Sequence, residues 1–318
     1  MKLPELKIGN LVAKLPIIQG GMAIRISTAP LAAAVAEEGG IGLIAATAMS
    51  MEELKQEIRK ARELTKGIIG INIMYAASEF ANVIKTAIEE GIDLVVSGAG
   101  FSRDMFGWGK STDVPIVPIV STPKLAQIAE KLGAAAVVVE GKEAGGHLGT
   151  NEPMKKIVPE VKKAVNIPVI AAGGIINGQD IVEALRLGAD GVQMGTRFAA
   201  SLECNAADSF KQLYIDARPE DVVLMESPVG LPGRGLVNNF MKKLFSGDDL
   251  SPKSCDGCLK KCSRRFCISR ALEAAQQGDM ENGLVFSGER VYDIKEILPV
   301  KEIIRRLLQE VEAAGNEV

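Results

Sequence analysis

Short apolar runs alternate with amphipathic stretches from Leu15 to Gly195. In the first unit, an apolar run at 15–19 breaks at Gly20-Gly21, and an alanine-rich amphipathic stretch follows from 30 to 38. Similar runs recur at 42–47, 68–74, 93–97, 115–120, 135–140, 168–172 and 191–195. Apolar residues at helical spacing predict helices between them at 51–65, 78–90, 123–132, 153–165 and 178–187.

Eight strand–helix units of this kind predict a (β/α)8 TIM barrel. The runs are nearly continuous and rich in β-branched residues, which is typical of parallel strands covered on both faces. A doubly wound open sheet is the alternative, but it usually has fewer strands and carries its phosphate-binding glycines at the first turn. The interval from Gly98 to Asp113 is short, so we expect an irregular connection there in place of a regular helix.

The pattern changes after Phe198. Residues 199–298 contain a predicted helix at 204–216, a Pro/Gly-rich loop at 228–235, a group of cysteines, and a second helical stretch near 268–277. We interpret this segment as a C-terminal lid over the barrel mouth. The predicted organisation is therefore a barrel core at 1–198, a lid or cap segment with the cysteine cluster at 199–298, and a C-terminal helix at 299–318 that packs back on the barrel.

Composition narrows the classes of partner. The 318 residues are 47% hydrophobic and include 33 glycines, which is typical of a globular enzyme with many tight turns. The formal net charge of -3 argues against nucleic acid or an anionic membrane surface as a partner, and no run is long enough to span a membrane. The N-terminus lacks a signal-peptide core, so we expect a cytoplasmic protein that acts on a small molecule.

Polar residues and glycines end the predicted strands. Active residues of such barrels lie at the C-terminal strand ends, and the loops after strands seven and eight often bind phosphate. Gly173-Gly174 and Gly195-Thr196 occupy these two loops, where backbone N–H groups and a hydroxyl can bind an anion. This indicates a phosphorylated cofactor or substrate, although the glycines could equally serve only to turn the chain.

His147 is the only histidine, and it lies in the glycine-rich loop 140–149 after the sixth run. Its side chain titrates near neutrality, so it is a candidate acid, base or hydrogen-bond donor. The alternative is a histidine that only closes a loop.

Four of the five cysteines fall within 13 residues. Clustering of this kind in a cytoplasmic protein favours metal ligation over disulfides, and four thiolates could enclose Zn2+ or a [4Fe-4S] cluster. The spacing matches no standard motif, and reduced thiols or disulfides remain alternatives. The predicted ligands are Cys255, Cys258, Cys262 and Cys267.

Five segments carry a family resemblance: Gln19–Met22, Gly70–Met74, Glu143–His147, Ala171–Gly174 and Gln193–Phe198. Together they resemble the FMN-dependent nitronate monooxygenases (formerly 2-nitropropane dioxygenases) and the flavin enoyl-ACP reductase II. The resemblance covers residues 12–200.

The resemblance implies FMN at the barrel mouth and His147 as the catalytic residue beside it. The phosphate is expected at Gly173, Gly174, Gly195 and Thr196. The ring edge is expected near three residues on the first and third units, and three more residues complete the cofactor-binding set. These are Gly21, Met22 and Asn72 at the ring, with Glu140, Gly145 and Met194.

The expected activity is that of enoyl-ACP reductase II, in which NAD(P)H reduces FMN and hydride passes to a trans-2-enoyl thioester on a small molecule or acyl carrier. Here His147 would stabilise or protonate the enolate. The first alternative is nitronate monooxygenase, which oxidises alkyl nitronates with O2. The second is a non-flavin barrel that binds a phosphorylated ligand. A basic stretch beside the cysteines could attract an acidic carrier protein or NAD(P)H phosphates, and a homodimer remains open.

Overall fold

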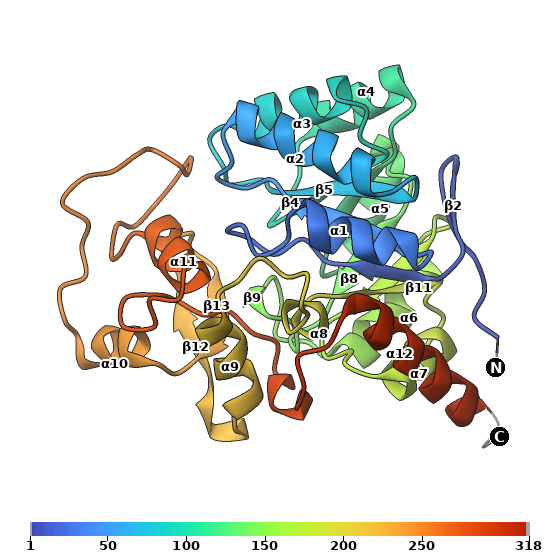
Figure 1. Ribbon diagram of the computed structural model, residues 1–318. Helices are drawn as coiled ribbons and strands as arrows, with labels where there is room; N and C mark the ends of the chain where they lie inside the picture. The colour runs from blue at the N-terminus through green and yellow to red at the C-terminus, as the bar shows by residue number, and fades with distance from the viewer. Residues whose placement is uncertain (1, 316–318) are drawn as a thin grey trace.

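A closed barrel of eight parallel strands forms the centre of the computed structural model, which describes residues 2–315 (Figure 1). Strand β11 pairs with β3, with Val192 opposite Ile17, and this pairing closes the barrel. The predicted (β/α)8 fold is confirmed. The strands are β3 (Ile17–Gln19), β4 (Ile41–Ala45), β5 (Ile68–Met74), β6 (Leu94–Gly98), β7 (Ile116–Val120), β8 (Val137–Glu140), β10 (Val169–Ala172) and β11 (Gly191–Met194).

Seven helices connect successive barrel strands, and polar caps begin several of them. The Ser50 and Thr122 side chains accept hydrogen bonds from the N–H groups of Glu53 and Leu125, which stabilises two helix starts. The helices are α1 (Ala29–Glu37), α2 (Met51–Leu64), α3 (Phe80–Glu89), α4 (Arg103–Thr112), α5 (Pro123–Leu132), α6 (Met154–Ala164) and α7 (Gly178–Arg186). After β11 comes the short α8 (Thr196–Ala199), and α12 (Val300–Gly315) packs against α7 and α1.

The prediction of an irregular connection before Asp113 is wrong, because α4 is a regular ten-residue helix. Ser102 accepts a hydrogen bond from the Met105 N–H and caps the helix. Gly109 faces the barrel, where an added Cβ would overlap Ile116 of β7. A glycine on the inner face therefore lets a short helix lie close to the sheet, which the strand–helix pattern did not indicate.

Aliphatic side chains fill the inside of the barrel and the end at which its strands begin. Ile18, Leu43, Val96 and similar residues are fully buried inside, and each such side chain contributes about 1.5–3 kcal/mol to folding. The N-terminal hairpin β1 (Leu6–Ile8) and β2 (Leu11–Ala13) joins the same cluster and packs at the end away from the strand C-termini. The opposite end is left for the site.

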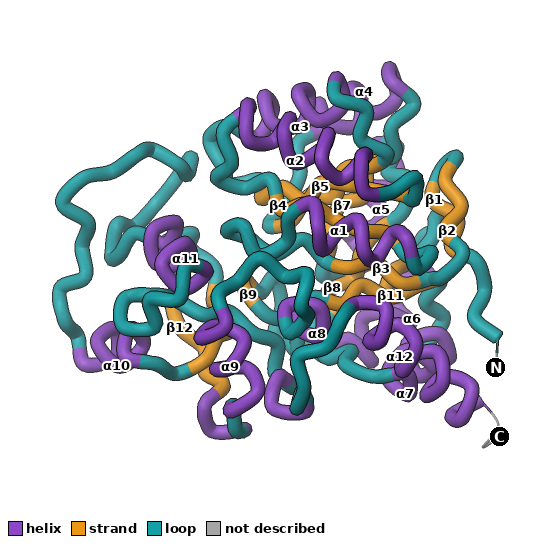
Figure 2. Tube along the Cα trace, viewed as in Figure 1, coloured by secondary structure: helices purple, strands orange, loops and turns teal. Residues whose placement is uncertain are grey.

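The segment after α8 forms a cap with its own small core, in which Phe240, Met241 and Phe266 are buried. Strand β13 (Pro232–Leu236) lies between β12 (Val222–Glu226) and the short strand β9 (Gly146–His147), and the three form one sheet (Figure 2). The helix predicted from 204 begins at Asp208. The cap elements are α9 (Asp208–Asp216), η1 (Pro219–Asp221), β12 (Val222–Glu226), β13 (Pro232–Leu236), α10 (Asn239–Ser246), α11 (Ile268–Gln276) and η2 (Val291–Asp293), and β9 is Gly146–His147.

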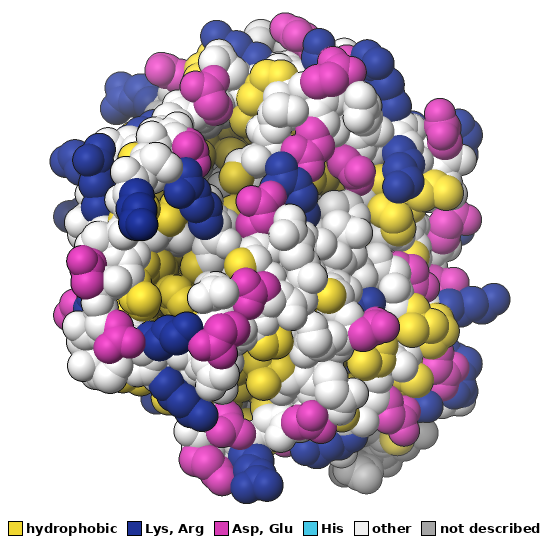
Figure 3. Space-filling model, turned by 60° about the vertical axis from the view of Figure 1, so that its left-hand side comes forward, with side chains coloured by type: hydrophobic (Ala, Val, Ile, Leu, Met, Phe, Trp, Pro, Cys, Tyr) yellow, Lys and Arg dark blue, Asp and Glu magenta, His cyan; other side chains and the backbone are white. Residues whose placement is uncertain are grey.

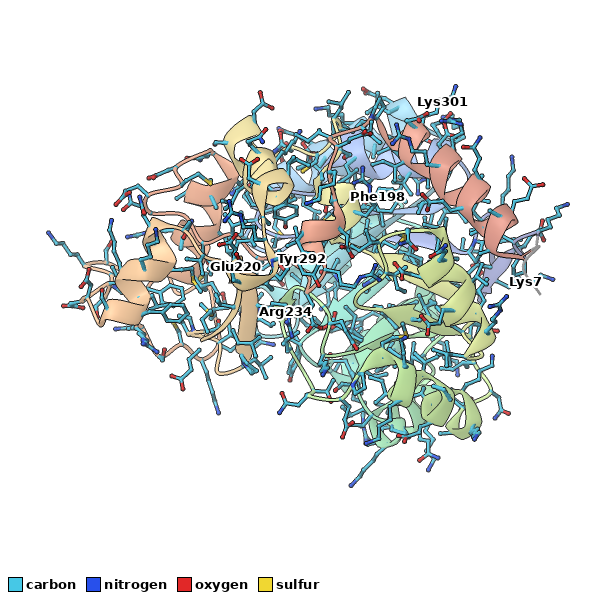
Figure 4. All side chains as sticks on the ribbon, turned by 90° about the horizontal axis from the view of Figure 1, so that it is seen from below. Lys7, Phe198, Glu220, Arg234, Tyr292 and Lys301 are labelled. Atoms are coloured by element: carbon cyan, nitrogen blue, oxygen red, sulfur yellow. The ribbon has the colours of Figure 1, made fainter. Side chains whose placement is uncertain are left out.

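Two arginines tie the cap to the barrel. Arg25 pairs with Glu53 of α2 at 2.5 Å and with Glu273 of α11 at 2.8 Å. Arg234 on β13 donates to the Lys142 carbonyl at 2.6 Å, and Figure 4 shows it at the junction of cap and barrel. The cap is therefore anchored on both sides of the barrel mouth. Within residues 2–315, no helix has the length and apolar character needed to cross a membrane.

Candidate active site

A cavity of about 270 Å³ lies at the C-terminal ends of the barrel strands, between the barrel and the cap. The structure brings every predicted cofactor and catalytic residue of the barrel to its wall. These residues are Gly21, Met22, Asn72, Glu140, Gly145, His147, Gly173, Gly174, Met194, Gly195 and Thr196. The cap supplies an apolar wall of Leu259, Ile268, Leu272, Leu284 and Phe286.

The loops after β10 and β11 form one end of the cavity. Gly173 and Gly174 have φ values of +100° and +73°, a backbone conformation that side chains disfavour. The added Cβ of a residue at 173 would also lie 3.1 Å from the Ala144 backbone nitrogen. Thr196 Oγ1 accepts a hydrogen bond from the Gly288 N–H at 2.9 Å. This bond brings to this end the cap's return segment, residues 277–299, which leads from α11 to α12.

Arg290 is a residue at this end that the sequence analysis missed. Its Nη1 donates to the Gly174 carbonyl at 3.2 Å and pairs with Asp180 at 2.6 Å, while its Nε donates to Asp293 at 2.8 Å. Arg290 lies 116 positions after Gly174, and no local pattern links the two. A guanidinium is thus fixed at the end where the phosphate is expected.

Two buried polar atoms in the cavity wall have no protein partner among the described residues. They are Oε1 of Gln193, on β11, and Oγ of Ser287, in the cap's return segment. An unsatisfied buried polar group costs about 1–3 kcal/mol, so both atoms are suited to a polar molecule in the cavity. Gln193 belongs to a motif that the sequence analysis quoted, but its role was not named. Ser287 carried no sequence signal.

Close packing also fixes the loop after β3, beside the loop after β11. An added Cβ at Gly21 would overlap the Cβ of Asn72, so only glycine fits against this β5 residue. The Met22 N–H donates to Ser27 Oγ at 2.8 Å, which holds the loop after β3 in place. Gly21, Met22 and Asn72 therefore form one continuous surface.

Glu140, the last residue of β8, has a carboxyl group with a strongly raised pKa. Burial disfavours its charged form and raises the pKa of its carboxyl from 4.5 to about 8. At neutral pH the side chain is mostly a neutral carboxylic acid, which can donate a hydrogen bond as well as accept one.

His147 lies on β9, where it is paired with Gly233 of the cap strand β13. Its Nε2 is 2.7 Å from Ser227 Oγ, and its ring meets Phe286 edge-on at 5.2 Å between centroids. Burial lowers the pKa of His147 from 6.5 to about 4. The imidazole is therefore neutral at pH 7 and is held by residues of the cap.

The four clustered cysteines do not assemble into a metal site. Among residues 2–315, no group of three or more His, Cys, Asp or Glu side chains is placed to hold a metal ion, so the structure does not support the predicted Zn2+ or [4Fe-4S] site. Cys255 and Cys262 are exposed, whereas Cys258 lines the cavity and Cys267 precedes α11. Backbone pairing of 258–260 with 76–78 keeps this loop extended against the barrel.

Comparisons with known proteins decide the family. A family model described as nitronate monooxygenase matches residues 5–310. The chain belongs to the nitronate monooxygenase family. This family member is an FMN-dependent oxidoreductase, which sets aside the non-flavin alternative.

Relatives of this nitronate monooxygenase family member carry several names. FabK from Thermotoga maritima is 35% identical with a TM-score of 0.88, covering 96% of this chain and 95% of that one. A probable nitronate monooxygenase from Staphylococcus saprophyticus is 30% identical over 91% of this chain and 92% of its own length. A (3aS,4S,5R,7aS)-5-hydroxy-7a-methyl-1-oxo-octahydro-1H-indene-4-carboxyl-CoA dehydrogenase from Rhodococcus jostii is 33% identical over 72% of this chain, which spans only 64% of that relative's length.

The cavity fits the cofactor of the nitronate monooxygenase family. The glycine turn at 173–174, the Thr196 hydroxyl and the Arg290 guanidinium suit a phosphate, and the unpartnered Gln193 and Ser287 atoms suit further polar groups. The close-packed surface of Gly21, Met22 and Asn72 suits a flat ring.

Proposed function

We propose that this protein reduces the double bond of a trans-2-enoyl thioester with electrons from NAD(P)H, as expected for an enoyl-ACP reductase II. The observation that carries the proposal is the polarity of the cavity beside His147: the cap wall there is apolar, and burial lowers the pKa of His147 to about 4, so its imidazole is uncharged at pH 7. FMN, when bound, supplies the hydride. Gly173, Gly174, Gly195, Thr196 and Arg290 would hold its phosphate.

The cavity has little to offer an anionic substrate. Arg290 is the one cation among the described residues that line it. Arg290 also lies at the Gly174 end, where the cofactor phosphate is expected. A nitronate carries a negative charge, whereas a thioester is neutral, and burying an unpaired charge is costly. The charge distribution therefore favours the thioester.

The cap wall suits the acyl part of such a substrate. Leu259, Ile268 and Leu272 come from the cysteine-rich loop and α11, and Leu284 and Phe286 come from the return segment. Burial of apolar surface stabilises a bound chain by about 25 cal/mol per Å². Figure 3, which turns the cap toward the viewer, shows a hollow with hydrophobic side chains at its base and Lys and Arg side chains beside it.

His147 would act as the electrophile. An imidazole N–H that donates to the thioester carbonyl oxygen stabilises the negative charge that develops there as hydride reaches the β-carbon. Loss of one such donor typically lowers kcat by about 10²–10³. A neutral imidazole suits this role better than that of general base, since a pKa of about 4 gives a weak base at pH 7.

The names of two relatives support a thioester substrate. FabK, an enoyl-ACP reductase II, is similar along nearly the whole chain, and the Rhodococcus relative is named for a CoA thioester. Nitronate monooxygenase is the second candidate, favoured by the family model and by the Staphylococcus relative.

Steady-state assays of the FMN-loaded protein separate the two candidates. We expect NADH or NADPH oxidation that depends on crotonyl-CoA, and loss of this activity in His147→Ala with FMN content unchanged. Turnover of propionate 3-nitronate with O2 uptake, without any thioester-dependent oxidation of NAD(P)H, would instead establish the monooxygenase.

A further inference from the structure

We infer that Ser227 is a positioning residue that fixes the tautomer of His147, with the proton on Nδ1 and the Ser227 hydroxyl donating to Nε2. The use of Nδ1–H toward a substrate rests on the proposed function, but the tautomer itself does not. Nothing in the sequence pattern linked these residues, which are 80 positions apart.

The backbone on both sides of the contact is held by hydrogen bonds. On the histidine side, β9 pairs with β13, and the Leu148 N–H donates to the Pro232 carbonyl at 2.8 Å. Ser227 begins the turn from β12 to β13, where its N–H donates to the Leu231 carbonyl and its carbonyl accepts from the Gly230 N–H. The serine and the imidazole are therefore presented to each other by one sheet.

The hydrogen bonds of Ser227 set the direction of its contact with His147. Ser227 is only 6% exposed, and its Oγ accepts from the Val229 N–H at 3.3 Å. Within residues 2–315, its O–H has no acceptor other than His147 Nε2, at 2.7 Å. If Nε2–H donated instead, Oγ would accept twice and its buried O–H would have no acceptor. Buried polar groups are nearly always satisfied, so the hydroxyl donates to Nε2.

This direction leaves the second ring nitrogen for the cavity. A neutral imidazole that accepts at Nε2 carries its proton on Nδ1. Nδ1 has no hydrogen-bond partner among the described residues, and His147 lines the cavity. The edge-on contact with Phe286 restrains rotation of the ring, and burial favours the neutral form. Ser227 thus supplies what a hydrogen-bond donor to a carbonyl needs: a fixed ring and a proton on Nδ1, the nitrogen that Ser227 does not contact.

The tautomer can be read directly, because this chain has a single histidine. The untagged, FMN-loaded protein is labelled with 15N-histidine, and the couplings of each ring nitrogen to the ring C–H protons are recorded at pH 7. We expect Nδ1 to carry the proton and Nε2 to give the signal of an unprotonated nitrogen. A protonated Nε2, alone or with Nδ1, would overturn the proposal whatever reaction the enzyme catalyses.

Variants test whether Ser227 determines the tautomer of His147. Ser227→Ala should shift the proton toward Nε2 or give a mixture of tautomers, whereas Ser227→Thr keeps a hydroxyl and should retain the wild-type spectrum. Ser246→Ala, at an exposed site on α10, is the matched control. A wild-type spectrum in Ser227→Ala would show that Ser227 does not fix the tautomer of His147. If the proposed function holds, kcat of Ser227→Ala falls roughly tenfold, the worth of one hydrogen bond, with FMN content unchanged.

Discussion

Arg290 of the cap's return segment donates to the carbonyl of Gly174 and pairs with Asp180 at 2.6 Å. Asp180 also accepts from the Asn177 N–H in the capping box that begins α7. One guanidinium thus joins the cap to the glycine turn and to the start of a barrel helix. The end of the cavity where the cofactor phosphate is expected is completed by a residue from outside the barrel.

Arg290→Ala should weaken FMN binding. The change removes a positive charge beside the expected phosphate and frees the Gly174 carbonyl, and a charged hydrogen bond is worth about 1.5–3 kcal/mol. We expect the dissociation constant, measured by the recovery of flavin fluorescence on release, to rise at least about tenfold. Arg305→Ala removes an exposed arginine of α12 and should leave it unchanged. Equal affinity in the two variants would exclude Arg290 from the phosphate site.

Gly21→Ala should destabilise the protein, because the new Cβ would overlap Asn72. Overpacking of this kind costs about 1–3 kcal/mol, which a lowered Tm and FMN loss would report. Gly107→Ala is the control, since its Cβ meets nothing within 4 Å in α4. A helical Gly to Ala change stabilises by up to about 1 kcal/mol. If Gly21→Ala behaves like Gly107→Ala, the loop after β3 has room that the structure does not show.

Glu140→Gln should change how stability depends on pH. The folded pKa of Glu140, about 8, is above its unfolded value of 4.5. The folded state therefore binds more protons between these values, and this group's contribution to stability falls as pH rises from about 4.5 to 8. Glutamine cannot ionise, so the variant should gain stability relative to the wild type across that range, as measured by urea unfolding at several pH values. Parallel stability curves for the two proteins would show that Glu140 is ionised in the folded state.

Lys260→Ala should loosen the loop that carries Cys258 and Leu259 to the cavity. Lys260 Nζ donates to the Tyr75 carbonyl at 2.7 Å and lies over the Tyr75 ring at 3.9 Å. Cation–π contacts contribute about 0.5–2 kcal/mol. We expect faster amide hydrogen exchange at Ser78 and at position 260, whose N–H groups pair the loop with the barrel, and a higher KM for thioester. Lys261→Ala, at the exposed neighbouring position, should change neither quantity. Slow exchange in Lys260→Ala would show that the backbone pairing alone is sufficient.

The barrel half of the site could be predicted from sequence, and the cap half could not. Gly21, Gly173 and Thr196 follow apolar runs and Asn72 lies near the end of one, and parallel strands bring such positions to one edge. Ser287 and Arg290 line the cavity and Ser227 contacts His147 only because distant segments meet there, and no periodic pattern marks these residues.

Local spacing gave one wrong prediction and one that the structure does not support. It did not anticipate α4, where Gly109 permits close packing. It suggested a metal site at the cysteines, but the direction of four side chains on an extended loop depends on how that loop docks on the barrel.

The most direct test of the account is the reoxidation of the photoreduced protein in the absence of O2. A neutral donor at His147 and an apolar cap wall predict that crotonyl-CoA restores the oxidised flavin spectrum anaerobically, within the time of a turnover. His147→Ala should be reduced normally but reoxidise at least about a hundredfold more slowly. A wild-type flavin that stays reduced with enoyl thioesters and is reoxidised only when O2 is admitted would contradict the assignment of a thioester substrate.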